Sequence, residues 1–193
     1  PQSVIKIDDC AFRKCSMLKI IKIPSSVEFI GKSVFMECKK LNKVSILSMI
    51  SEIQPYSFSG CKLLSQVEVP PSLTLIGKGA FSGCSSLEMM SIPSSIISIQ
   101  DFAFSGCSSL KNINIPSLLV KISSYTFSLC SSLRNVIFEK SSHIKVIEES
   151  AFRGCSSLST ISLPDSVVYI GDYVLKGCKS LKKVTNTSSL IYV

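Results

Sequence analysis

Nine cysteines and a single histidine are the side chains of this 193-residue sequence with the widest range of chemistry. Structural zinc sites usually take ligand pairs two to four residues apart, and no Cys-x₂-Cys occurs here. His143 lies in a short polar stretch with Ser141 and Ser142, where no cysteine or aspartate column could complete a catalytic triad. The sequence therefore predicts a protein without enzymatic activity, cofactor or metal site.

The spacing of the cysteines indicates an internal repeat instead. After the first cysteine, six follow one another at intervals of 23 residues, and steps of 25 and 23 lead to the last two. A phenylalanine, or Leu175 in the last unit, stands three residues before each, and a leucine stands three residues after. Because the column is apolar, we expect small buried side chains with unreactive thiols. The members are Cys15, Cys38, Cys61, Cys84, Cys107, Cys130, Cys155 and Cys178.

The rest of the unit predicts how these columns are held. The pattern Leu-x-x-Ile-x-Ile alternates as a short strand with one buried face does, and the proline that usually follows ends the strand. The period of three in Phe-x-x-Cys-x-x-Leu suits a 3₁₀ or single-turn helical segment. One unit cannot bury its apolar side chains alone, so neighbouring units must stack. We expect an α/β repeat solenoid, an open arc with a parallel concave sheet and with short strands and 3₁₀ or single-turn helical segments on its outer side. It is built as one array over residues 1–193, with eight repeats and the start of a ninth.

These columns read Leu-x-x-Ile-x-Ile-Pro-x-Ser-Val-x-x-Ile-Gly-x-x-Ala-Phe-x-x-Cys-x-x-Leu, which closely resembles the BspA-like, or treponemal-type, leucine-rich repeat. The resemblance implies a non-enzymatic family of cell-surface proteins of oral anaerobes, treponemes and mucosal protists that adhere to host matrix proteins and to other cells. The sequence departs from the pattern at five places. They are Leu47 and Glu139 in place of proline, Leu175 in place of phenylalanine, Asn186 in place of an aliphatic residue, and two extra residues between Phe138 and Ile144.

The candidate binding surface is the outward-facing side of the predicted concave sheet. In each strand the two residues that flank the first isoleucine of the pattern point away from the core. In the middle of the array these residues are mainly amides and hydroxyls, which suit a protein partner, with a host matrix or cell-surface protein favoured by the resemblance. The predicted positions are Gln66, Glu68, Met89, Ser91, Asn112, Asn114, Asn135 and Ile137.

The excess of positive charge suggests a second way of binding. Lysine and arginine number 21 against 13 acidic residues, a net charge of +8, and many of them crowd the first two units. Such a patch favours an acidic glycan, whereas nucleic acid is not expected because no aromatic residues interleave with the lysines. The predicted basic patch comprises Lys19, Lys22, Lys39, Lys40 and Lys43.

The sequence is compatible with two cellular locations. The resemblance implies the cell surface, whereas unpaired cysteines favour an intracellular scaffold or regulator. Cys10, outside the cysteine column, is expected to be free, with a bridge to Cys15 as the alternative. Asn186 opens an Asn-Thr-Ser sequence that fits the glycosylation acceptor pattern. Both ends interrupt the repeat, so we expect a fragment of a longer array, with any membrane attachment through segments outside it.

Overall fold

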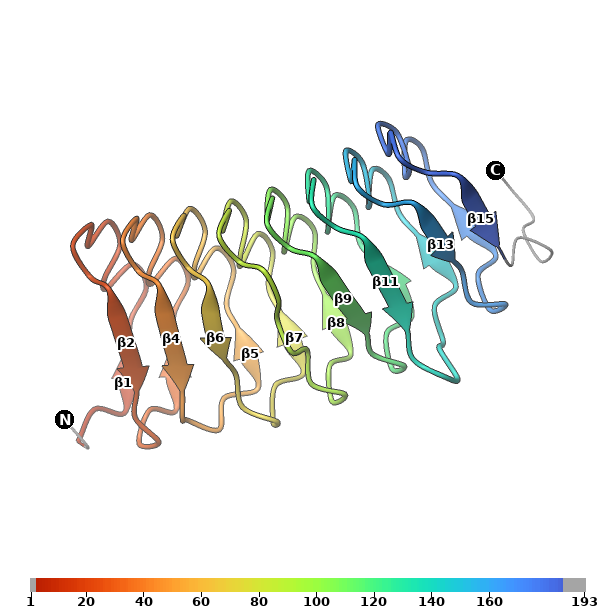
Figure 1. Cartoon of the computed structure of the whole chain (residues 1–193). Coiled ribbons are helices and arrows are strands. Elements are labelled where there is room, and N and C mark those ends of the chain that lie inside the picture. Colours follow the sequence, from red (N-terminus) through yellow and green to blue (C-terminus); the bar gives the residue numbers. More distant parts are fainter. Residues whose placement is uncertain (1–2, 186–193) are drawn as a thin grey trace.

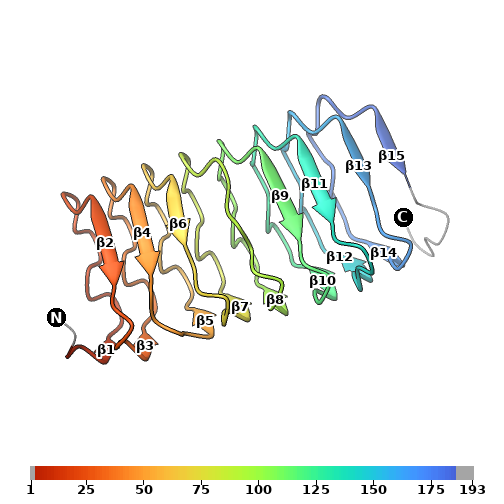
Figure 2. The same ribbon diagram turned by 60° about the horizontal axis from the view of Figure 1, so that its bottom comes forward.

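The computed structural model describes residues 3–185, and the chain winds through them as a stack of coils. The coils lie side by side in sequence order and turn gradually along the stack (Figure 1). All coils but the one with residues 88–92 contribute a strand to a row along one face, and each coil contributes a shorter strand to a second row along another face (Figure 2). The predicted solenoid with parallel strands is confirmed.

The first row consists of strands of three or four residues, which we call the long row. Paired residues lie one repeat apart, as in Ile21 opposite Val44 and Val44 opposite Val67. Alternate side chains of these strands are buried, as a strand with one covered face requires. The long row comprises β2 (Ile20–Ile23), β4 (Lys43–Ile46), β6 (Gln66–Glu68), β9 (Asn112–Ile115), β11 (Asn135–Phe138), β13 (Thr160–Ser162) and β15 (Lys183–Thr185).

The second row, the short row, consists of two-residue strands, whose positions the sequence analysis did not assign. Its second residue is an isoleucine in every coil, buried in six of them and partly buried at Ile7 and Ile170, and the residue before it is more exposed. A glycine directly after the strand allows close approach in three coils, and a Cβ on Gly77, for example, would lie 2.7 Å from the backbone of the preceding coil. The short row comprises β1 (Lys6–Ile7), β3 (Phe29–Ile30), β5 (Glu52–Ile53), β7 (Leu75–Ile76), β8 (Ser98–Ile99), β10 (Lys121–Ile122), β12 (Val146–Ile147) and β14 (Tyr169–Ile170).

The expected α/β class and the expected helical segments are wrong, because residues 3–185 contain no helix. The Phe-x-x-Cys-x-x-Leu segments are chains of turns in which successive N–H groups alternate between two kinds of acceptor. The N–H groups of Tyr56 and Phe58 donate to carbonyls of the next coil, whereas those of Ser57 and Cys61 donate to carbonyls three residues back. A helix would need all of these donors for itself. It follows that this part of the chain contains no helix able to cross a membrane.

The core is a set of ladders that run along the stack. Seven phenylalanine rings, from Phe12 to Phe152, lie nearly parallel with centroids 5.3–5.6 Å apart. Leu175 continues the column without a ring and packs, partly buried, against the core. The cysteines form a second ladder beside the rings, and each buried thiol donates to the carbonyl of the phenylalanine in the preceding coil. The predicted apolar columns are therefore confirmed as the core.

The long row is not continuous over residues 3–185. Its strands pair as β2–β4–β6, β9–β11 and β13–β15, with no ladder between these groups. The first interruption falls at residues 88–92, which form no strand, and there Met90 replaces the β-branched residue that favours strands elsewhere in the column. The second falls between β11 and β13, in the unit with two extra residues. Those residues are absorbed between β11 and β12, because β10 and β12 stay in register with Lys121 opposite Val146.

Candidate binding face

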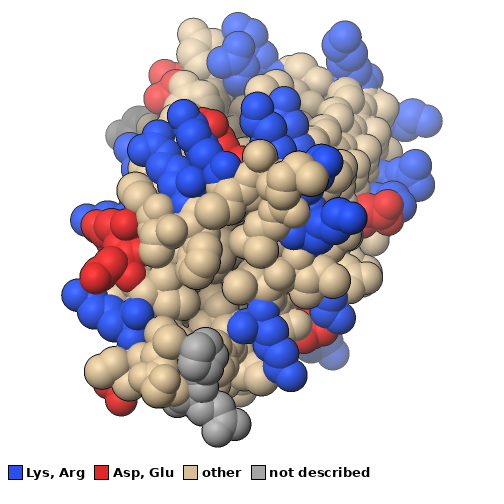
Figure 3. Space-filling model, turned by 90° about the vertical axis from the view of Figure 1, so that its left-hand side faces the viewer, with Lys and Arg blue, Asp and Glu red and all other residues tan. Residues whose placement is uncertain are grey.

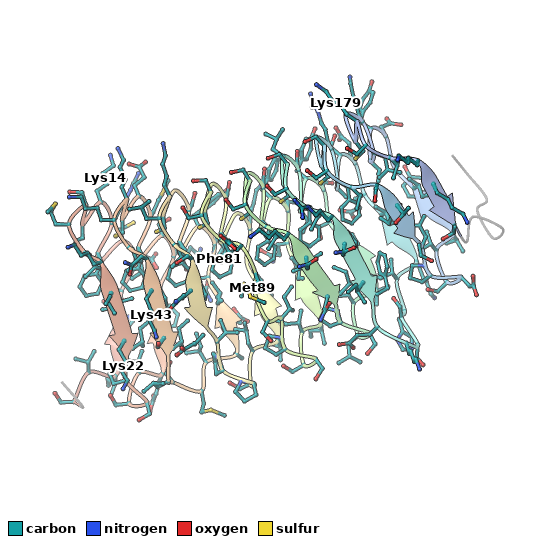
Figure 4. All side chains as sticks on the ribbon, viewed as in Figure 1. Lys14, Lys22, Lys43, Phe81, Met89 and Lys179 are labelled. Atoms are coloured by element: carbon teal, nitrogen blue, oxygen red, sulfur yellow. The ribbon has the colours of Figure 1, made fainter. Side chains whose placement is uncertain are left out.

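The outward side of the long row carries the residues that were predicted to bind. All eight predicted positions are exposed, Met89 at 71% and Ile137 at 53%. Figure 4 shows Met89 on the surface of the array and Phe81 inside it. Met89 and Ser91 do not lie on a strand, since they fall in the first interruption of the row.

An amide pair lies at the centre of this face. The Asn135 Nδ2 group donates to Asn112 Oδ1 at 2.6 Å, and the two residues are directly opposite in the β9–β11 register. Asn114 is opposite Ile137 in the same ladder. Each asparagine amide has more donors and acceptors than this bond uses. The face therefore presents hydrogen-bonding groups at a fixed repeat on a rigid sheet.

The N-terminal part of the face is charged rather than neutral. The Glu68 carboxylate accepts from Ser45 Oγ at 2.7 Å and lies 3.6 Å from Lys43 Nζ. The hydrogen bond from Ser45, followed by the charge of Lys43, lowers the pKa of Glu68. The alternation of side chains along the strand predicted that Ser45 would be exposed. It is buried, because this carboxylate covers it. Glu68 therefore stays ionised and offsets part of the positive charge of the two preceding strands.

The predicted basic patch is divided between two parts of the surface. Lys22 and Lys43 lie on the long row, whereas Lys39 and Lys40 lie on the turn before Leu41, and Lys19 directly precedes β2. Figure 4 shows Lys14 at the turn edge, well away from Lys22. Lysine and arginine side chains project all around this end of the array (Figure 3).

A groove that the sequence analysis did not identify adjoins Ile137. It lies at the second interruption of the long row, between the ends of β11 and β13, and encloses about 520 Å³. The two signals that could have revealed it are the replacement of proline by Glu139 and the two extra residues after it. Its lining includes Ile137, Glu139, Ser142, Leu163, Pro164 and Asp165.

The thiols are unreactive where they are buried, and two are not buried. Burial raises the pKa of Cys61 to about 12 and that of Cys84 well above its usual range. Cys15 is exposed, so the expectation that all eight column cysteines are buried is wrong there. Its coil is the first one described and has a neighbour on one side only. Cys10 is a free and exposed thiol, as expected.

We expect iodoacetamide at pH 8 to alkylate Cys10 and Cys15 in the folded protein and to leave the other seven cysteines unmodified. Thiols react as thiolates, and Cys61, with a pKa of about 12, remains protonated even when the pH is raised to 10. Peptide mass spectrometry of the native and urea-unfolded protein measures the sites, with all nine modified after unfolding. Alkylation of Cys84 at the rate of Cys10 would contradict the buried ladder.

The remaining candidates from the sequence are a metal site, His143 and Asn186. No group of three metal-ligating side chains is present in residues 3–185. The His143 ring lies on the surface with its Nδ1 atom 2.9 Å from the Ser117 carbonyl oxygen. The predicted acceptor Asn186 and the start of a ninth unit lie outside the described residues.

Solved structures with the same fold show what this array is similar to. A leucine-rich cell surface protein of Faecalibacterium prausnitzii matches with 29% identity and a TM-score of 0.68, over 96% of this chain and 44% of that one. The T. pallidum leucine-rich repeat protein TpLRR matches with 26% identity and a TM-score of 0.71, over 93% and 72%. The pneumococcal vaccine antigen PcpA matches with 26% identity and a TM-score of 0.58, over 94% and 53%.

The chain thus spans less than half of the first of these structures. A comparison with curated proteins found no match. The family model for the BspA type leucine-rich repeat region, which holds six copies of the repeat, matches residues 1–96 and 75–193, so that the two matches together span the whole sequence. With the phenylalanine, cysteine and leucine ladders in place, this match shows that the chain belongs to the BspA type leucine-rich repeat family.

Proposed function

We propose that this array is a non-enzymatic recognition module of a cell-surface protein and that it binds a protein partner on the outward side of the long row. The observation that carries the proposal is the exposed field of amides around Asn112, Asn114 and Asn135. These groups are held in register by β9 and β11 and have donors and acceptors to spare. A partner can meet them without any rearrangement of the scaffold, which limits the entropy cost of binding.

A surface location is supported by the similarity to the leucine-rich cell surface protein of F. prausnitzii. The free cysteines, which favoured an intracellular scaffold at first, are compatible with oxidising surroundings. Seven of them are buried, and a thiol held in its protonated form reacts slowly with oxidants and disulfides. The partner favoured by the family is a host matrix or cell-surface protein.

The test is capture on a panel of immobilised matrix proteins, namely collagen, laminin and fibronectin, compared between the wild type and a triple variant with Asn112, Asn114 and Asn135 changed to alanine. We expect the variant to lose at least about tenfold in affinity, because several exposed hydrogen bonds of about 0.5–1.5 kcal/mol each are removed together. Its melting temperature should change little, because these side chains are exposed.

A matched control changes Ser51, Thr74 and Ser98 to alanine, which alters three polar positions along the short row instead. This control should bind like the wild type. If the two triple variants bind equally well to a captured matrix protein, the long-row face is not its binding site.

A second candidate, supported by the lysines at the N-terminal end (Figure 3), is adhesion to an acidic glycan. The same measurement separates it from protein recognition when heparin is added to the panel. Reversing the charge of Lys39 and Lys40 to glutamate should abolish heparin retention if the glycan is the ligand, and that retention should collapse as salt is raised. Protein capture on the amide face should survive both changes.

A further inference from the structure

The groove at the second interruption of the long row arises from the only unit of 25 residues. In the other described units a proline, or Leu47, follows this segment, and outside the first interruption at residues 88–92 the long-row strands pair in register with the next coil. Here Glu139 follows β11, and the loop between β11 and β12 is two residues longer than the corresponding loop of the other units. The strands on either side stay paired to their other neighbours, β9 and β15, so the interruption is local. Glu139 and residues of this longer loop therefore line the groove between β11 and β13.

The groove combines apolar walls with carboxylates. Ile137 on β11 is 53% exposed, and the half-buried Pro164 follows shortly after β13, whereas Leu163 lines the groove with only 2% of its surface exposed. Glu139 and Asp165 line the same space. Glu139 is held in place, because its Oε2 atom accepts the backbone N–H of Ser117 at 3.0 Å. A fixed carboxylate beside exposed aliphatic surface is a suitable site for a long cationic side chain.

The charge around the groove also favours a cationic side chain as the ligand. The protein carries a net charge of +8, yet the charged side chains that line this groove are both acidic. Lys140 and His143 belong to the same loop and are exposed, but neither lines the groove. A cation that reaches the groove gains two nearby carboxylates, whereas an anion would meet like charge.

We propose that the groove between β11 and β13 receives a lysine or arginine side chain of the protein partner, with the aliphatic stem on Ile137 and Pro164 and the charged head at Glu139 and Asp165. The proposal rests on the proposed function, because Ile137 belongs to the same exposed face as the asparagines. It adds the chemistry of the partner: a basic residue at the point of contact, beside groups that bond to the amide field.

The test uses small probes, so that it does not depend on the identity of the partner. Methyl-labelled protein is titrated with Nα-acetyl-arginine amide, with Nα-acetyl-norleucine amide, which has the stem without the charge, and with putrescine, which has charge without a peptide backbone. We expect the arginine probe to shift the methyl resonances of Ile137 and Leu163 saturably in the millimolar range. The other two probes should bind more weakly.

The variant Glu139→Gln/Asp165→Asn should lower the affinity for the arginine probe by about fivefold or more, which corresponds to a loss of about 1 kcal/mol of binding free energy. Glutamine keeps an oxygen acceptor for the Ser117 N–H, so the loop is retained. The control Glu28→Gln/Asp172→Asn removes the same charge at exposed positions outside the groove and should leave binding unchanged.

Three results would overturn the proposal: no shift of either methyl group, equal binding by norleucine amide, or tighter binding by putrescine. An affinity that survives the loss of both groove carboxylates would do the same. The outcome is separable from that of the proposed function, because the asparagine triple variant leaves the groove intact. Arginine binding with unaltered matrix capture in that variant would refute the amide face alone.

Discussion

Replacing Phe81 by alanine should lower the free energy of unfolding by about 3–5 kcal/mol, the usual cost of emptying a buried phenylalanine site. The ring is fully buried and stacks on Phe58 at 5.3 Å and on Phe104 at 5.4 Å. In a linear array each coil is stabilised mainly by its two neighbours, so the substitution weakens both interfaces of one coil at once. Urea unfolding followed by far-ultraviolet circular dichroism measures the change.

The control for this substitution is Phe29→Ala. Phe29 is 41% exposed on β3 and lies outside the ring ladder, so the cost should be about 1 kcal/mol or less. A loss below about 1 kcal/mol for Phe81→Ala, or equal losses for the two variants, would show that the ring ladder does not hold the coils together.

The second large effect is expected at Gly77, where alanine should cost about 2–3 kcal/mol because of overpacking. A Cβ there would lie 2.7 Å from both the Ile53 carbonyl oxygen and the Pro55 nitrogen. These are backbone atoms of the preceding coil, so the clash can be relieved only by separating two coils. The reduction should appear in the same urea experiment.

Gly83→Ala is the matched comparison because it adds the same methyl group where there is room. Its nearest contacts would be at 3.8 Å, and the remaining cost comes from its φ of +72°. Other coils already place Glu37 and Leu129 in that column with φ of 61° and 62°, so we expect about 1 kcal/mol. If Gly83→Ala proved the more harmful substitution, backbone strain rather than coil spacing would limit the stack.

The sequence predicted the features that each unit repeats. The columns of phenylalanine, cysteine and leucine indicated the core, and Leu-x-x-Ile-x-Ile indicated the strands of the long row. Both are confirmed, because an apolar position that recurs in every unit can be buried only by the unit before and the unit after. The outward positions, such as Asn112 and Asn135, followed from the alternation of side chains along a strand. Their role in binding stays a prediction.

The segments for which the sequence-based prediction was wrong or incomplete are those where contacts between coils override a local pattern. The period of three around Cys61 fits a series of turns as well as a helix. The turns form because alternate N–H groups donate to carbonyls of the next coil, which are not evident from the sequence of one unit. The two-residue strands of the short row are too brief for a periodic signal, and their pairing becomes visible only when coils are stacked.

The sequence by itself determined that this protein is a stack of coils and which residues fill its interior, since burial in an array repeats with the unit. Only the tertiary structure decided how the surface is divided: the helix-free turns, the exposed Cys15 and the groove beside Ile137. Each of these depends on what the neighbouring coil offers at a given level, and the groove exists because β11 and β13 lack the ladder that joins other coils.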